Sequence, residues 1–252
     1  MKTLVAITVL FGLTTCHTPR KHATSPDSIR LVSFNIYKCQ RGENAVVAQI
    51  RDKNPAVACL QEVRIEDHDR LAARLGMYHV FQNHRNYPSE GVAIYSRTPL
   101  ANVKPVIDPD GRTCALFADT TIAGRRVTIA SVHLVATQHL KDVARSDRMR
   151  GTEIALIKQA WKDRGGGPIV IAGDFNQIPM GGNYKAMRDG FIDALAKLNQ
   201  TDNTLGDGLL RARVDYFLID RQSWKPIDGG TGPAGASDHL LIWFDATLAK
   251  EF

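Results

Sequence analysis

The chain has 252 residues, of which 44% are hydrophobic and 23% are charged, and its formal net charge is +6. This composition excludes a mainly disordered chain, and the length is sufficient for one large domain with a substantial buried core. The basic balance suits an anionic substrate, but it is also common in exported proteins without a polyanionic partner, so it does not identify the substrate.

The first sixteen residues are typical of a bacterial secretory signal. Lys2 precedes an apolar stretch from Leu4 to Leu13, which is too short to span a membrane. Leu13-Thr14-Thr15-Cys16 resembles a lipobox, in which Cys16 would carry the lipid, although the threonine before it departs from the usual small residue. We expect an exported protein, either a periplasmic or lipid-anchored protein or a secreted one, with residues 17–27 as a tether. The alternative is a cytosolic chain with a buried N-terminal strand.

Eight runs rich in β-branched and apolar residues predict strands along the rest of the chain. These runs are Ile29 to Ile36, Ala56 to Val63, Gly91 to Ser96, Thr113 to Thr121, Arg126 to Leu134, Pro168 to Asn176, Arg213 to Ile219, and Leu240 to Leu248.

Three segments between the strands have the apolar spacing of amphipathic helices. The first, around Ala45 to Ile50, stops at Pro55, and a second covers Leu71 to Leu75. The third and clearest covers residues 149–161 and ends at Gly165-Gly166-Gly167. We interpret this glycine run as a helix stop, because no lysine-serine pair follows it as in a phosphate loop.

Beyond Cys16 the cysteines are Cys39, Cys59 and Cys114, an odd count without a CxxC pair. They predict neither a disulfide framework nor a zinc ribbon, and one disulfide between two of them stays open. Cys59 lies in an apolar run and is expected in the core.

One catalytic domain, residues 28–252, is the simplest organisation, because there is no repeat and no second linker. Strands that alternate with helices, and hairpin-like pairs such as Thr113 to Thr121 with Arg126 to Leu134, predict mixed sheets. Two mixed sheets packed face to face with helices outside would form a four-layer α/β/β/α sandwich of the α+β class.

Polar residues lie at or just past the ends of several predicted strands, where they would converge on one rim. They are Asn35, Glu62, His133, Asp174 with Asn176, Asp215, and Asp238 with His239. In an extended segment Asp174 and Asn176 would project to the same face, since they are two residues apart. Taken singly, each polar residue also has a structural interpretation, such as a turn cap, a helix start, or a pair between Asp215 and Arg211 or Arg213.

The order of the short motifs around these residues resembles the endonuclease/exonuclease/phosphatase superfamily. The motifs are Phe34-Asn35, Leu60-Gln61-Glu62, Ser131-Val132-His133-Leu134, Gly173-Asp174-Phe175-Asn176, Val214-Asp215-Tyr216 and Ser237-Asp238-His239. The resemblance implies the four-layer sandwich and a divalent cation, usually Mg²⁺, for which Mn²⁺ could substitute. Because nucleases, sphingomyelinases and phosphatases share these motifs, the resemblance does not specify the substrate.

Hydrolysis of a phosphate ester needs positive charge where negative charge develops on the phosphate oxygens. A magnesium ion supplies it with few carboxylate ligands, so we expect Glu62 as principal metal ligand, Asn35 as a helper and Asp238 as a second carboxylate. His239 is predicted to take a proton from the attacking water, oriented by Asp215. Asp174 and Asn176 would hold the water and phosphate in line, or bind a second metal.

The superfamily resemblance also places His133 on the opposite side of the phosphate. There a cationic imidazole would stabilise the transition state or protonate the leaving oxygen, so the two histidines would have opposite protonation states. Arg112 is a candidate for a forked contact to phosphate, and the alternative for Arg112 is a solvated arginine in a turn.

The segment His79 to Pro88 mixes cationic and aromatic side chains in a predicted loop, which could stack on a base, contact a lipid headgroup or be an ordinary surface loop. We expect a monomeric phosphodiesterase with nucleic acid as the preferred substrate, and membrane contact only through a lipid on Cys16. The alternatives are a sphingomyelinase or phospholipase C-type enzyme, a phosphatase of small phosphate esters, and an inactive binding module with the same fold.

Overall fold

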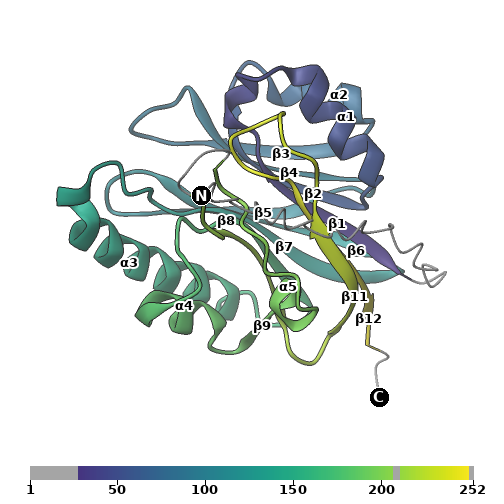
Figure 1. Cartoon of the computed structure of the whole chain (residues 1–252). Helices are drawn as coiled ribbons and strands as arrows, with labels where there is room; N and C mark the ends of the chain where they lie inside the picture. The colour runs from purple at the N-terminus through teal and green to yellow at the C-terminus, as the bar shows by residue number, and fades with distance from the viewer. Residues whose placement is uncertain (1–27, 207–210, 250–252) are drawn as a thin grey trace, which may run out of the picture.

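The computed structural model describes residues 28–206 and 211–249, which build two six-stranded sheets packed face to face between helices (Figure 1). The predicted export signal and tether, residues 1–27, lie outside the described residues. Two mixed sheets with helices on their outer faces confirm the predicted four-layer sandwich.

The first sheet joins the N-terminal strands to the C-terminal ones. Its strands, in spatial order, are β11 (Trp224–Thr231), β12 (Ile242–Leu248), β1 (Ile29–Asn35), β2 (Val57–Arg64), β4 (Glu90–Ser96) and β3 (Tyr78–Asn83). Strands β1 and β2 are parallel and are connected through α1 (Glu43–Lys53), whereas their other neighbours pair antiparallel. The helix α2 (His68–Leu75) lies beside α1 over the outer face of this sheet (Figure 1).

The second sheet contains the middle of the chain. Its strands, in spatial order, are β5 (Ala101–Ile107), β6 (Thr113–Ile122), β7 (Arg125–His133), β8 (Ile169–Asp174), β10 (Asp215–Asp220) and β9 (Phe191–Asp193). Strands β7 and β8 are parallel and are connected through α3 (Val143–Lys162). The remaining helices are α4 (Gly181–Arg188), α5 (Ala194–Lys197) and the 3₁₀ turns η1 (Tyr37–Cys39) and η2 (Leu140–Asp142).

Alternation of side chains along the strands determines the layers, because successive residues point to opposite faces of a sheet. In β1, Leu31 packs between the two sheets, and Val32 packs against the helices outside. In β2, Cys59 lies between the sheets, as expected for a core residue, and Leu60 faces the helices. Both faces of the central strands are therefore buried, which explains why the motifs follow nearly continuous apolar runs.

The predicted helices are confirmed, and their ends have the expected physical causes. Asn54 ends α1 in the left-handed conformation directly before Pro55. The glycine run follows α3, where Gly165 and Gly166 have φ values of 80° and 73° that suit glycine. The predicted hairpin is also confirmed, because β6 and β7 pair antiparallel from Ala115 to Ile122.

Several predicted strand limits were wrong. The structure adds β3, β5, β9 and β11, all four of which lie at sheet edges, where the hydrophobic pattern is weak. The segment His79 to Pro88 is not a loop throughout, since its first five residues pair with β4 as part of β3. The last two predicted strands start later than expected, at Asp215 and Ile242, because the residues before them are held by loop hydrogen bonds.

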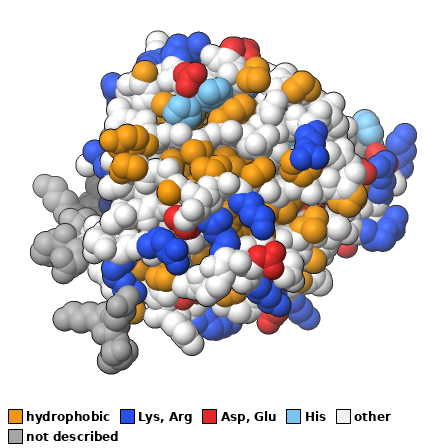
Figure 2. Space-filling view, turned by 180° about the vertical axis from the view of Figure 1, so that it is seen from behind, with side chains coloured by type: hydrophobic (Ala, Val, Ile, Leu, Met, Phe, Trp, Pro, Cys, Tyr) orange, Lys and Arg blue, Asp and Glu red, His pale blue; other side chains and the backbone are white. Residues whose placement is uncertain are grey.

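Three thiols, those of Cys39, Cys59 and Cys114, are free in the structure. No helix within the described ranges is both long and apolar enough to cross a membrane. Charged and hydrophobic side chains are intermixed on the face of the molecule shown in Figure 2.

Candidate active site

Three predicted site residues lie side by side at one end of the inner strands of the second sheet. His133 ends β7 beside Asp174, the last residue of the parallel strand β8. Strand β10 runs the other way, so its first residue, Asp215, lies opposite Asp174. Directly opposed residues project from the same face of a sheet. The strand register therefore aligns an imidazole and two carboxylates in one row.

The first sheet contributes Asn35 from the end of β1 and Glu62 from β2. Glu62 lies near the end of β2, within the predicted strand range, at a bulge between Gln61 and Val63. The bulge gives Glu62 a φ of 53°, a left-handed conformation that is uncommon for residues other than glycine and is often found at functional sites.

The two sheets meet at Asn35. Its Nδ2 donates to Oε1 of Glu62 at 3.1 Å and to Oδ2 of Asp174 at 3.2 Å. One buried amide thus links the carboxylate of the first sheet to the carboxylate row of the second.

Asp174 is the centre of the group. Its Oδ2 accepts from Nδ2 of Asn176 at 3.2 Å, and it lies 3.8 Å from Nε2 of His133 and 3.6 Å from Nε2 of His239. Asn176 lies beyond the end of β8 and has a φ of 47°, so the predicted extended segment ends at Asp174. The turn nevertheless brings the two side chains together, and the Asn176 backbone N–H also donates to Oδ1 of Asp174 at 2.8 Å.

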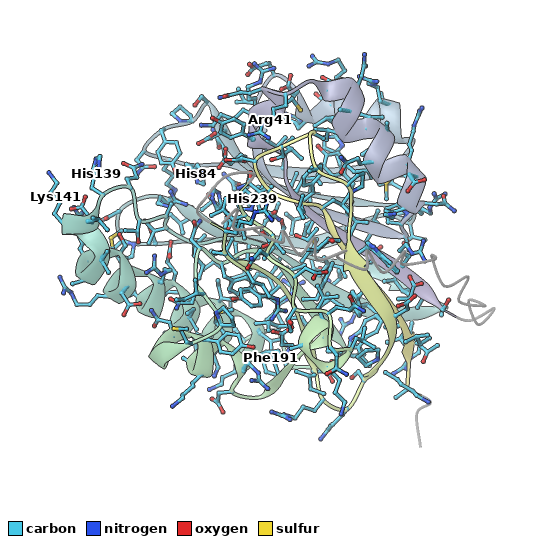
Figure 3. All side chains as sticks on the ribbon, in the orientation of Figure 1. Arg41, His84, His139, Lys141, Phe191 and His239 are labelled. Carbon is cyan, nitrogen blue, oxygen red and sulfur yellow. The ribbon has the colours of Figure 1, made fainter. Side chains whose placement is uncertain are left out.

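His239 lies on the loop before β12, between the helices of the two outer layers (Figure 3). Its Nδ1 contacts Oδ2 of Asp215 at 2.9 Å, as predicted from sequence. Ser237 fixes this loop, because its hydroxyl donates to the backbone oxygen of Asn35 at 2.7 Å and accepts from the His239 N–H at 3.2 Å. The alternative pairing of Asp215 with Arg213 is wrong, because Arg213 pairs with Asp193 at 2.7 Å.

The charges around the two histidines favour opposite protonation states for them. The sequence interpretation expected a cationic His133 and a neutral His239, and the structure favours the reverse. Burial lowers the pKa of His239, but Asp215 and Asp174 outweigh burial and raise it to about 10. His133 is buried near the positive charges of Arg112 and the rings of His84 and His239, so its pKa falls well below its ordinary value. With only the carboxylates of Asp174 and Asp215 to balance the charge, His239 is therefore favoured in its protonated form and His133 in its neutral form.

Arg112 is not a solvated turn residue. One of its terminal nitrogens donates to Tyr87 Oη at 2.5 Å, and the other donates to the backbone oxygen of His133 at 3.3 Å. Arg112 also lines a hollow together with Arg145 and Ser146. Its guanidinium thus stands beside His133, the last residue of β7.

Two residues near the group, Lys38 and Glu90, escaped the sequence interpretation of the site, whereas Tyr87 lies in the segment His79 to Pro88, which was a candidate substrate contact. Lys38 Nζ lies 4.0 Å from Oε2 of Glu62 and 3.1 Å from Oε2 of Glu90, and Tyr87 contacts Arg112. Lys38 has a φ of 55° and is the middle residue of three with positive φ values. This unusual backbone conformation is visible in the structure but not in the amino-acid sequence. Neither Lys38 nor Glu90 belongs to a sequence motif, so only the packed structure identifies them.

The donor set fits a hard divalent cation. Burial first, and then the charges of Glu90 and Asp238, raise the pKa of Glu62, against the hydrogen bond from Asn35 and the charge of Lys38. This carboxylate thus lacks enough positive charge around it, and a cation would supply that charge. Asp174, Asp215 and His239 form a second set whose ligand atoms all lie within 4.8 Å of one another. Carboxylate and amide oxygens are the ligands that Mg²⁺ prefers.

Comparison with known proteins gives a family match over most of the chain. The model of the endonuclease/exonuclease/phosphatase family matches residues 32–239. Mouse protein angel homolog 2 is 29% identical over 204 residues, which are 72% of this chain. The match spans only 36% of the mouse protein.

Solved structures show the same fold at low sequence identity. A Bacteroides vulgatus endonuclease/exonuclease/phosphatase has a TM-score of 0.75 at 18% identity, covering 88% of this chain and 99% of its own. The human Nocturnin catalytic domain has a TM-score of 0.71 at 20% identity, covering 90% and 96%. ANGEL2, described as a 2′,3′-cyclic phosphatase and also solved with adenosine-2′,3′-vanadate, has a TM-score of 0.67 at 15% identity, covering 87% and 95%. Since the family model covers the strands and loops that supply the candidate site, this chain belongs to the endonuclease/exonuclease/phosphatase family, whose members hydrolyse phosphate esters.

Proposed function

We propose that this chain is a divalent-metal-dependent phosphodiesterase that acts on nucleic acid, including nucleotides with a terminal cyclic phosphate. The observation that carries the proposal is the position of Asp174, whose Oδ2 lies among two amides and two imidazoles from both sheets. The solved ANGEL2 complex with adenosine-2′,3′-vanadate supports a nucleotide phosphodiester among the substrate classes of the family.

Asp215, His239 and Asp174 form a proton-handling chain. The carboxylate of Asp215 accepts from Nδ1 of His239 and so directs Nε2 towards Asp174. In the proposed reaction Nε2 takes the proton from the attacking water, and Asp174 with Asn176 holds that water against the phosphate. Unprotonated Nε2 requires that the carboxylate charge around His239 be partly neutralised.

Glu62 and Asn35 would hold a divalent cation, Mg²⁺ or Mn²⁺, with Asp238 as a further carboxylate. Bound there, the cation supplies positive charge to the phosphate oxygens and offsets the carboxylate charge that favours protonated His239.

His133 and Arg112 would bind the phosphate from the other side. Nδ1 of His133 is buried without a hydrogen-bond partner, so the neutral ring places its proton on Nε2, towards Asp174. Nε2–H can therefore donate to a phosphate oxygen, and the guanidinium of Arg112 adds positive charge beside it. This role replaces the predicted cationic His133.

The test is product release by the purified chain from three substrates in parallel: plasmid DNA, an RNA oligonucleotide with a 2′,3′-cyclic phosphate end, and sphingomyelin. Each is assayed with Mg²⁺, with Mn²⁺ and with chelator, and with Glu62→Gln as the matched variant. We expect metal-dependent turnover of a nucleic acid that Glu62→Gln abolishes. Headgroup release alone would refute the nucleic-acid substrate, and chelator-resistant turnover would refute the metal requirement.

We also propose export, with a lipid on Cys16 as the membrane contact. Support comes from the signal-like residues 1–16 and the lipobox-like sequence that ends them. Mass spectrometry of the mature protein would detect an acylated N-terminal Cys16, and Cys16→Ser should release the protein from the membrane fraction. A mature chain that keeps Met1 would contradict the proposal.

A further inference from the structure

A second group of metal-ligating side chains lies where α2 approaches the edge strand β3. His68 and Asp69 begin α2, and His79 is the second residue of β3. The register pairs His79 with Tyr95 and Tyr95 with Ala58, four residues from Glu62 along β2. At about 3.3 Å per residue, this group is more than about 10 Å from the candidate active site.

The two imidazoles are held in place before any ligand binds. His68 stacks on Phe81 with ring centroids 4.5 Å apart and an interplanar angle of 11°. His79 stacks on Tyr95, at 5.7 Å and 16°, and the Tyr95 hydroxyl donates to the backbone oxygen of His68 at 3.2 Å. Asp69, whose side chain is 84% exposed, completes the group from the solvent side.

Three ligand atoms of this group lie close to one another. Nδ1 of His68 and Nε2 of His79 are 2.9 Å apart, and Oδ1 of Asp69 lies 3.4 Å from the first and 3.2 Å from the second. Ligands of a tetrahedral zinc ion with bonds of 2.0–2.1 Å are about 3.3 Å from one another. The three separations therefore match a tetrahedral site after the two rings move apart by a few tenths of an ångström.

Hydrogen bonding alone does not satisfy all three contacts. If only one of the two nitrogens carries a proton, the other nitrogen turns its lone pair towards the Asp69 oxygen. If both carry protons, the two N–H groups oppose each other between His68 and His79. Each arrangement leaves one repulsive contact, whereas a cation at the common point makes all three contacts attractive.

We propose that His68, Asp69 and His79 bind Zn²⁺ or a similar divalent transition metal, with the fourth position open to water. Imidazole ligands suit zinc, copper and nickel, whereas Mg²⁺ prefers oxygen, so this site differs in metal preference from the candidate active site. A histidine pair beside an acidic side chain is visible on the face shown in Figure 2. The bound ion links α2 to β3, so it stabilises the folded chain, and the gain grows with the logarithm of the free zinc concentration above Kd.

The experiment titrates Zn²⁺ into the tag-free, chelator-stripped chain by calorimetry in excess Mg²⁺. Asp174→Asn serves as the background, because it removes a carboxylate of the catalytic group. We expect one zinc ion per chain and a rise in Tm with zinc. With Co²⁺ in place of zinc, we expect the visible absorption bands of tetrahedral cobalt.

Two variants and one matched control decide the assignment. In the Asp174→Asn background, His79→Gln and Asp69→Asn should each weaken zinc binding. For His79→Gln we expect a loss of roughly 100-fold in zinc affinity, because removing a metal ligand costs more than removing a residue that only hydrogen-bonds to a ligand. His139→Gln should leave binding unchanged, because His139 is exposed at the far end of the loop before α3 (Figure 3). Equal zinc affinity in His79→Gln, Asp69→Asn and His139→Gln, or the absence of saturable binding, would overturn the proposal. Because Asp69 is exposed, a folding defect in His79→Gln would not prevent the test.

Discussion

Asp174 shows how one residue combines charge and position in this fold. Burial raises its pKa to about 7, with His239 lowering it and Asp215 raising it. The carboxyl group therefore holds a proton more readily than an exposed aspartate does, and its protonation depends on the neighbouring charges. A group in that state can exchange protons with His239 and respond to a bound cation.

His239 is the residue whose removal should affect turnover most. We expect His239→Ala to lower kcat by about 10²- to 10⁴-fold, because it removes the proposed proton acceptor for the attacking water. The measurement is kcat on the substrate identified by the parallel assay, with circular dichroism to establish folding. His139→Ala, at an exposed histidine, is the control and should keep the wild-type rate. Near-full activity of His239→Ala would show that another group is the base.

Glu153 should make the stability of the protein depend on pH. Burial raises its pKa to about 8, and Arg112 does not offset burial because its Nε lies 3.9 Å from Oε1, beyond hydrogen-bond distance. A carboxyl group with a raised pKa in the folded state stabilises the fold at low pH and loses that contribution as pH rises. The loss starts above the unfolded value near 4.5 and is complete above about 8.

Glu153→Gln removes this titration and keeps an oxygen for the Val135 N–H, which donates to Glu153 at 3.0 Å. We expect the free energy of unfolding of wild type to fall relative to the variant by up to about 1.4 kcal/mol per pH unit between roughly pH 5 and pH 8. Urea unfolding across this range measures the difference, with the exposed Glu66→Gln as control. Parallel pH curves for wild type and Glu153→Gln would show that Glu153 is ionised in the fold.

At the scale of elements, the site depends on irregular points in otherwise regular strands. Glu62 lies at the β2 bulge, Asn176 follows the end of β8 with a positive φ, and Gly173 lies just before Asp174. A Cβ added to Gly173 would lie 1.9 Å from the backbone oxygen of Val132 in β7. Glycine thus allows β7 and β8 to approach closely where they present His133 and Asp174.

Gly173→Ala should separate these two strands. We expect a loss of about 3 kcal/mol or more in the free energy of unfolding, because the added methyl group collides with backbone and the φ of 153° disfavours a side chain. Urea denaturation measures the loss. Gly182→Ala in α4, where an added Cβ meets nothing within 4 Å, is the matched control and should be neutral or stabilising by up to about 1 kcal/mol. Equal stability of the two variants would contradict the close approach.

At the scale of the whole molecule, the sandwich brings together side chains from opposite ends of the chain. Asn35 comes from the first strand and His239 from the loop before the last, and both contact Asp174 in the middle of the sequence. The net charge of +6 then favours the approach of an anionic substrate to this site.

The salt dependence of binding should distinguish a polynucleotide substrate from a small phosphate ester. Each phosphate contact neutralised by the protein contributes a slope of about −0.7 for single strands, or about −0.9 for duplex DNA, to log K against log salt. We expect Arg112→Ala to make the slope less negative by about one such contact on a nucleic acid, and to leave the weak salt dependence of a small phosphodiester unchanged. Arg126→Ala is the control, because this exposed arginine lies seven residues from His133 along β7. An unchanged slope in Arg112→Ala would exclude Arg112 as a phosphate contact.

The sequence by itself determined the family, the fold class and the polar residues of the motifs that meet in the candidate site. Local patterns carry that information, because apolar runs of strand length predict buried strands and the motif order places polar residues at their ends. The helices α1 and α3 were also predictable from their apolar spacing and their proline and glycine stops. The edge strands β3 and β9 were not, because edge strands have little hydrophobic pattern of their own.

Only the tertiary structure decided which atoms meet and which charges they favour. Asn35 and Asp174 are 139 residues apart, and their contact depends on how two sheets pack. The protonation of His133 and His239 depends on burial and on neighbouring charges, so identical side chains receive opposite pKa shifts. The His68, Asp69 and His79 group likewise joins a helix start to an edge strand. Such contacts form between separate secondary-structure elements, 11 residues apart for His68 and His79 and 139 for Asn35 and Asp174, and local sequence patterns do not encode them.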